Sequence, residues 1–107
     1  MTTFDKREEA FEKQFAIDEE LKFKAEARRD KLLGLWVAEK LELSRDAANT
    51  YAKTVIAADF EEAGGANVVR KVMTDLGVKG VAVTEQQIRQ KMSEFLAQAV
   101  VQVKAGT

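Results

Sequence analysis

Proline is absent from the 107 residues of this chain, and 33% of the residues are charged. Proline is the strongest helix breaker, whereas Lys, Arg and Glu are good helix formers, so this composition favours long helices. Glycine then marks the breaks, because all six glycines lie at or after Gly34 and four of them form the clusters Gly64–Gly65 and Gly77–Gly80. The length suits one domain. We therefore expect a single all-α domain.

The helix ends carry recognisable local signals. Thr84 and Gln87 have the spacing of a capping box, and Ser44 is a good N-cap residue. Gly77 follows a short apolar face and is expected to end its helix in the left-handed conformation. Together with the apolar spacing these signals predict a four-helix bundle domain over residues 21–107, with helices at about residues 21–43, 45–63, 66–76 and 85–104.

The beginning of the chain differs from the rest. Residues 1–31 hold 9 acids and 8 bases, whereas residues 32–43 are densely apolar. Charge is also sorted within the first part, since residues 1–20 carry 7 acids and 3 bases while residues 21–31 carry 5 bases and 2 acids. We expect the packed unit to begin near residue 31. Residues 1–20 are expected to form a mobile, partly disordered arm that continues a long first helix.

Three phenylalanines of the arm need burial. Phe4, Phe11 and Phe15 follow at steps of seven and four, so on a helix they share one narrow stripe. Burying each ring is worth about 2 kcal/mol. Either the stripe folds back onto the bundle, or it docks into the groove of a partner; we favour the partner.

The composition excludes several function classes. The chain has no His and no Cys, which removes the usual zinc ligands, a thiol nucleophile and a Ser-His-Asp relay. The net charge of −1 argues against a nucleic-acid partner, and no apolar run approaches the length of a membrane helix. We expect no enzyme, no metal site, no required cofactor and no membrane insertion, and a monomer when the protein is free.

A weak phosphate-binding pattern occurs at the third helix. A glycine pair precedes the helix, and two cations lie one to two turns into it, where free backbone N–H groups could help to hold a phosphate. The spacing lacks the P-loop signature, and a glycine pair between helices is usually only a turn. The candidate residues are Gly64, Gly65, Asn67, Arg70 and Lys71.

Three further patterns receive a structural interpretation. The Gly-x-x-Gly run from Gly77 to Gly80 lacks the sheet that a KH module needs. The run Arg28-Arg29-Asp30-Lys31 is interpreted as a solvated helix face rather than as a phosphate patch. Asp59 falls within the apolar face of the second helix, where it caps, pairs with a basic residue or marks the rim of a cleft.

Several longer motifs resemble one known family, the zeta subunit of alphaproteobacterial F-type ATP synthases. The most specific is Arg28-Arg29-x-Lys31-Leu32-Leu33-Gly34-Leu35-Trp36, and the similarity covers essentially the whole chain. It also includes the runs Phe4-Asp5-Lys6-Arg7-Glu8, Phe11-Glu12, Phe15, Asp18-Glu19-Glu20-Leu21, Ala27, Ala38-Glu39-Lys40-Leu41, Tyr51-Ala52-Lys53, Ala58-Asp59-Phe60-Glu61-Glu62-Ala63-Gly64, Arg70-Lys71 and Gln87-Ile88-Arg89.

The resemblance implies an inhibitor of ATP hydrolysis. Its arm, about residues 1–20, would enter an α/β catalytic interface of the ATPase head as a wedge near the rotor stalk. The implied partners are the α, β and central stalk subunits, and the implied location is cytoplasmic, held peripherally at the inner membrane through the ATP synthase. Phenylalanines would be the anchors and charged residues the rim contacts. The arm residues concerned are Phe4, Asp5, Lys6, Arg7, Glu8, Glu9, Phe11, Glu12 and Phe15.

The resemblance also bears on regulation. It implies an adenine nucleotide, ADP or ATP, as a regulatory ligand of the bundle. The related mitochondrial inhibitor is tuned by histidine protonation, and this chain carries Ile17 where family members often have His. Control is therefore expected from nucleotide, arm helicity or abundance. Family members often have Asn where this chain has Asp30 and Gly where it has Glu42. Because Glu42 replaces a residue that can break a helix, the end of the first helix is less defined here. The alternative function is a nucleotide-sensing or adaptor module whose arm is only a tether.

Overall fold

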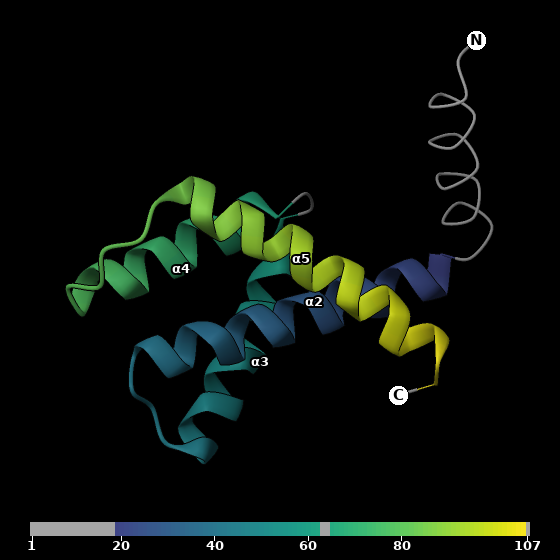
Figure 1. Ribbon diagram of the computed structural model, residues 1–107, viewed down its shortest axis with the longest axis horizontal. Coiled ribbons are helices and arrows are strands. Elements are labelled where there is room, and N and C mark those ends of the chain that lie inside the picture. The colour runs from purple at the N-terminus through teal and green to yellow at the C-terminus, as the bar shows by residue number, and fades with distance from the viewer. Residues whose placement is uncertain (1–18, 63–64, 107) are drawn as a thin grey trace, which may run out of the picture.

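The structure is a computed structural model that describes residues 19–62 and 65–106. These residues form four helices and no strand, which confirms the all-α four-helix prediction (Figure 1). The N-terminal part of the expected long first helix lies outside the described residues. The helices are α2 (Glu19–Lys40), α3 (Arg45–Glu61), α4 (Ala66–Val78) and α5 (Glu85–Lys104).

Helix α2 is the centre of the arrangement. It packs along both α3 and α5, and Figure 1 shows α5 crossing over α2 with α3 behind it. Helix α4 packs mainly against α3 and joins α5 through the loop at the far end of the molecule from the start of α2. Apolar side chains of all four helices meet in one core. Its buried members are Leu33, Val37, Val55, Val68, Val69, Val72, Leu76, Ile88 and Met92.

The helix starts follow their local sequence signals. The Thr84 hydroxyl accepts from the backbone N–H of Gln87 (3.1 Å), and the Gln87 side chain accepts from the backbone N–H of Thr84 (2.9 Å), which confirms the capping box. The Ser44 hydroxyl accepts from the N–H of Ala47, as expected for an N-cap. Both signals lie within four residues of the helix start, so tertiary packing does not override them.

The end of α4 differs from the prediction. Gly77 lies inside the helix, and the residue in the left-handed conformation is Gly80 (φ +73°). The N–H of Val81 donates to the carbonyl of Leu76 (2.9 Å), and the N–H of Gly80 to that of Gly77 (3.0 Å), which is a Schellman motif. Val81 packs against the core that contains Leu76. The helix therefore continues until Val81 can return to the core.

Helix α2 ends in the same way, but without glycine. Glu42 adopts φ +58°, and the N–H of Leu43 donates to the carbonyl of Ala38 (3.1 Å). The helix therefore stops at Lys40, three residues before the predicted end, and α3 stops at Glu61 rather than at residue 63. A left-handed non-glycine residue costs about 1–2 kcal/mol. The Schellman hydrogen bonds and the partly buried Leu41 and Leu43 offset this cost.

The packed unit begins earlier than residue 31, so that expectation was wrong. Ala25 is fully buried, and the rings of Phe23 and Phe60 stack on each other with centroids 5.3 Å apart. Arg28 donates to the Gln102 side chain on α5 (2.9 Å). High charge density indicated a solvated segment, but Ala25, Phe23 and Arg28 show that this part of α2 already packs against the rest of the bundle.

Gly34 lets α2 approach α3 closely. A Cβ at this position would lie 2.7 Å from the Ala52 Cα and 3.3 Å from the Val55 Cγ2, and backbone atoms cannot move aside as a flexible side chain can. The crossing therefore requires glycine, although glycine in a helix interior costs about 0.5–1 kcal/mol relative to alanine.

We predict that Gly34→Ala lowers the free energy of unfolding by about 1–3 kcal/mol, because the new methyl group forces the helices apart. The matched control is Gly77→Ala in α4, where a Cβ would meet nothing within 4 Å. That change is expected to raise stability by about 0.5–1 kcal/mol. Urea unfolding of both variants measures the effects, and a stabilised Gly34→Ala protein would contradict the close crossing.

Candidate functional site

The predicted partner-binding residues of the arm, from Phe4 to Phe15, lie outside the described residues. The structure instead describes the base of the arm, which is the first half of α2 and what it packs against. Two features are built there: a buried ion cluster between α2 and α3, and a groove where α2, α3 and α5 meet.

The ion cluster centres on Arg29 of α2. Its Nη2 lies 3.1 Å from Asp59 Oδ2 on α3 and 3.0 Å from Asp30 Oδ1 on its own helix, and its Nε also donates to Asp30 Oδ1 (3.0 Å). The side chains are 13% (Arg29), 9% (Asp59) and 0% (Asp30) exposed. Of the three roles that the sequence left open for Asp59, the structure shows the ion pair.

The interpretation of Arg28-Arg29-Asp30-Lys31 as a solvated face was wrong for its middle residues. Only Lys31 is exposed, while Asp30 is the one buried charged residue in the described part of the chain. A signal was available, because Asp30 lies three and seven residues before the buried Leu33 and Val37 and so shares their helix face. The run of charges obscured this periodicity.

The pKa of Asp30 is raised from 3.8 to about 8. Burial is the largest cause and the neighbouring Asp59 carboxyl adds to it, while the Arg29 guanidinium opposes both. Asp30 Oδ2 is also buried without a hydrogen-bond partner among the described residues. One guanidinium cannot neutralise two buried carboxylates, so the cluster is neutral when Asp30 holds a proton.

This arrangement predicts a pH-dependent stability. Between about pH 4 and pH 8 the folded state holds the Asp30 proton and the unfolded state does not, so the stabilising effect of the proton is full below pH 3.8 and lost as the pH rises to about 8. Asp30→Asn removes this term. We expect the variant to gain stability over the wild type across this range, by at most about 1.4 kcal/mol per pH unit.

Chemical unfolding from pH 4 to pH 9 measures the difference. Glu39→Gln, which removes an exposed carboxylate from the same helix, is the control and should show no comparable rise. A constant difference between wild type and Asp30→Asn would show that Asp30 is ionised throughout.

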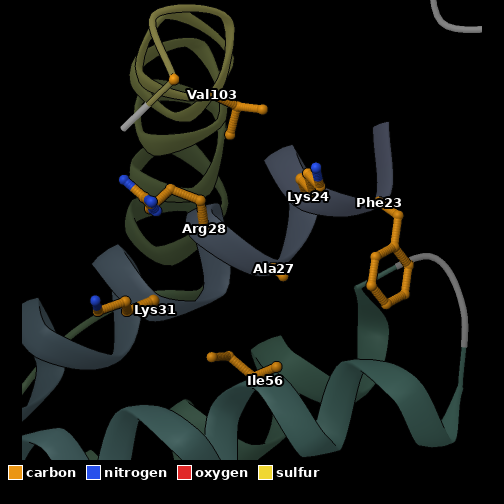
Figure 2. Close-up of a pocket in the computed structure, with 8 residues that line it drawn as sticks. Phe23, Lys24, Ala27, Arg28, Lys31, Ile56 and Val103 are labelled. Carbon is orange, nitrogen blue, oxygen red and sulfur yellow. The ribbon is translucent and has the colours of Figure 1, made fainter. Parts of the chain in front are cut away.

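The groove lies beside the cluster and encloses about 450 Å³. Figure 2 shows Arg28 and Lys31 extending to the same side of α2, while Ile56 rises from α3 toward α2. The groove combines cations with apolar side chains, and none of the described residues that line it is acidic. We call it the basic groove; the lining residues that matter below are Phe23, Lys24, Arg28, Lys31, Ile56 and Val103.

Next to the basic groove lies an exposed aromatic pair. Phe23 of α2 and Phe60 of α3 stack at an interplanar angle of 10°, and they remain 56% and 59% exposed. Stacked rings favour each other modestly, yet most of their surface still faces water. This pairing could not be predicted from the sequence, because Phe23 and Phe60 are 37 positions apart and their rings meet only when α3 packs on α2.

The structure brings together three of the five predicted phosphate-binding residues. Asn67, Arg70 and Lys71 line a second groove of about 550 Å³ between α3 and α4. Gly64 lies outside the described residues, and Gly65 is the buried N-cap of α4 with φ +81°. A Cβ on Gly65 would lie 3.0 Å from the Met92 methyl group, so this glycine serves the turn.

The cations of this second groove already have partners. Arg70 donates to the Asn67 side chain (3.3 Å), and Lys71 lies 3.0 Å from Asp75. Asp75 also accepts from the Tyr51 hydroxyl (2.7 Å), and burial together with this carboxylate raises the pKa of Tyr51. Glu61 and Asp75 both line the groove and would repel a phosphate. The Tyr51–Asp75–Lys71 contacts tie α3 to α4.

The described ranges contain neither a metal-binding cluster nor a membrane-spanning helix. No group of three or more acidic side chains there could hold a metal ion. None of the four helices is long and apolar enough to cross a membrane. The four helices and the two grooves define a small all-α protein whose described surface offers places for contact with another molecule.

Comparison with known proteins makes this class specific. The family model for ATPase inhibitor subunit zeta matches residues 1–102, and the chain belongs to this family. A protein structure solved by solution NMR is 49% identical, with a TM-score of 0.71; the match covers 81% of this chain and 99% of that chain. No match to a curated protein was found. The predicted resemblance to the zeta family is thus confirmed.

Proposed function

We propose that this chain inhibits ATP hydrolysis by the F-type ATP synthase and that residues 1–20 are its inhibitory element. The observation that carries the proposal is the family match, which spans residues 1–102 and therefore includes both the arm and the bundle. Membership in a family of inhibitor subunits supports association with the ATP synthase. The insertion of the arm as a wedge at an α/β interface near the rotor stalk is our proposal.

The chemistry of the arm supports insertion as a wedge. Phe4, Phe11 and Phe15 would share one stripe on a helix, which suits the apolar groove of a partner. Charged neighbours such as Lys6 and Glu12 would form rim contacts, which steer binding more than they add affinity. The arm would fold as it binds, so that part of the gross binding energy is spent on ordering it.

The contacts that the first half of α2 makes with α3 also support this mechanism. Arg29 binds Asp59, and Phe23 stacks on Phe60, so the first half of α2 is held against α3 at two points. Through this helix the inserted arm would be attached firmly to the bundle, and the bundle would stay outside the interface. The bundle would then limit how far the arm enters.

We predict that the double change Phe11→Ala, Phe15→Ala weakens inhibition of the isolated ATPase head by tenfold or more, as expected for the loss of buried aromatic anchors. Deletion of residues 2–18 should abolish inhibition. Both proteins should melt at the wild-type temperature, since their bundle residues are unchanged. Steady-state ATPase rates at graded inhibitor concentrations and thermal melting provide the two measurements.

Lys13→Gln is the matched control within the arm, because Lys13 would lie on the opposite side of the helix from the phenylalanine stripe. It should inhibit within about twofold of the wild type. If the truncated chain inhibits as well as the intact one, the arm is not the inhibitory element. If the double variant melts early, the stripe belongs to the bundle.

The remaining parts of the proposal concern partners and location. We place the protein on the α, β and central stalk subunits of the head, as a monomer when free, on the cytoplasmic side and attached to the inner membrane only through the ATP synthase. The family supports association with the enzyme. We assign the chain no catalytic step, since an inhibitor subunit acts by binding.

A regulatory adenine nucleotide is the second candidate function, favoured by the shared groove of Asn67, Arg70 and Lys71. If ADP binds there, titration should shift the amide resonances of α4, and Arg70→Ala should remove the shifts. Arg89→Ala, which removes an exposed arginine of α5, is the control. The absence of any shift at millimolar ADP would exclude this site.

A further inference from the structure

We propose that the basic groove and the adjoining Phe23–Phe60 pair form a second docking surface for the ATPase head, and that it receives an acidic segment bearing an exposed apolar side chain. This inference rests on the proposed function, because it takes the head as the partner. It adds a contact made by the bundle to the contact made by the arm.

The charges of the groove define its occupant. Lys24, Arg28 and Lys31 follow along one side of α2, and the described lining holds no carboxylate. Lys24 forms an ion pair with Glu20 (3.0 Å), and because the two side chains are 59% (Lys24) and 76% (Glu20) exposed, Glu20 is easily exchanged for a partner's carboxylate. The whole chain is nearly neutral, so this local excess of cations selects an acidic surface.

The apolar side chains of the surface define the second property of the partner, an exposed apolar side chain. Phe23 and Phe60 keep more than half of their surface in water, although both lie on helices and stack on each other. Rigid aromatic side chains are the commonest anchors of protein interfaces, since little conformational entropy is lost when a partner covers them. Ile56 and Val103 extend the apolar floor from α3 and α5 (Figure 2).

The position of the surface selects the ATPase head as the partner. Phe23 lies four residues after Glu19, the first residue of α2, and the arm joins α2 at that point. An arm that enters the head therefore brings the groove against the rim of the entry site. The C-terminal end of α4, which the exposed Val78 forms, lies at the opposite end of the molecule from the start of α2, so no such contact is expected there (Figure 1).

The test measures binding of the full chain to the isolated head, together with inhibition of its ATPase activity. Phe60→Ala removes one ring of the pair together with its stacking on Phe23, while the arm and the cations of the groove stay unchanged. Lys31→Glu reverses one exposed cation. We expect Phe60→Ala to weaken binding about tenfold, mainly through faster dissociation. Lys31→Glu should slow association and reduce its dependence on salt. Val78→Ala and Lys79→Glu, both exposed at the opposite end, are the controls.

A variant with an inactivated arm separates this inference from the proposed function. The Phe11→Ala, Phe15→Ala protein should keep weak, salt-sensitive binding to the head, and adding Lys31→Glu should remove it. If Phe60→Ala and Lys31→Glu bind and inhibit as the wild type does, the docking surface is wrong while the arm can still be the inhibitor. If the wild-type chain neither binds nor inhibits, both proposals fail.

Other occupants give different results, and each would overturn the inference. The chain's own acidic arm would compete with the head, so Phe60→Ala and Lys31→Glu would then inhibit more strongly than the wild type. A second copy of the chain would make the wild type dimeric in sedimentation and the variants monomeric. Thermal melting of both variants shows whether a loss of binding comes from a loss of folding.

Discussion

The contact of Arg29 with Asp59 is the interaction on which the base of the arm depends, because it holds the first half of α2 against α3. Burying this pair is favourable only if its charges balance, since an unpaired buried charge costs several kcal/mol. Asp30 enters the same cluster and would upset the balance, so burial keeps it protonated up to about pH 8. A charged segment, which by composition belongs in water, becomes part of the packed unit for this reason.

The close crossing at Gly34 and the ion cluster act together along one helix. Gly34 brings the α2 backbone against Ala52. One turn earlier Asp30 lies in the same interface, and two turns before that Phe23 reaches Phe60. Helix α2 is thus fixed to α3 by three kinds of contact over its length, while α5 covers its other side. This arrangement leaves exposed the basic groove at the end of α2 to which the arm is joined.

Local sequence signals predicted much of the fold, whereas contacts between residues far apart in the sequence were not predicted. Ser44 and Thr84 define helix starts through hydrogen bonds within a few residues, so the sequence was sufficient there. Gly77 failed as a helix end because the return of Val81 to the core, a tertiary contact, decides where α4 stops. The Arg29–Asp59 pair joins residues 30 positions apart, and its existence depends on how α2 and α3 are packed.

For the candidate site, Asn67, Arg70 and Lys71 line one groove, but the sequence did not reveal that Asp75 and Glu61 line the same groove. The arm residues lie outside the described part of the chain, so their role rests on the phenylalanine spacing and the family.

The absence of histidine has a narrower meaning than the sequence suggested. It removes the residue that ordinarily titrates near neutral pH. It does not remove titration near neutral pH, because burial beside a second carboxyl moves the pKa of Asp30 into that range. Ionisation of Asp30 places a second negative charge on a single guanidinium and so weakens the contact between α2 and α3. The predicted pH dependence of stability therefore rests on a carboxyl group that the helix periodicity, and not the composition, identifies.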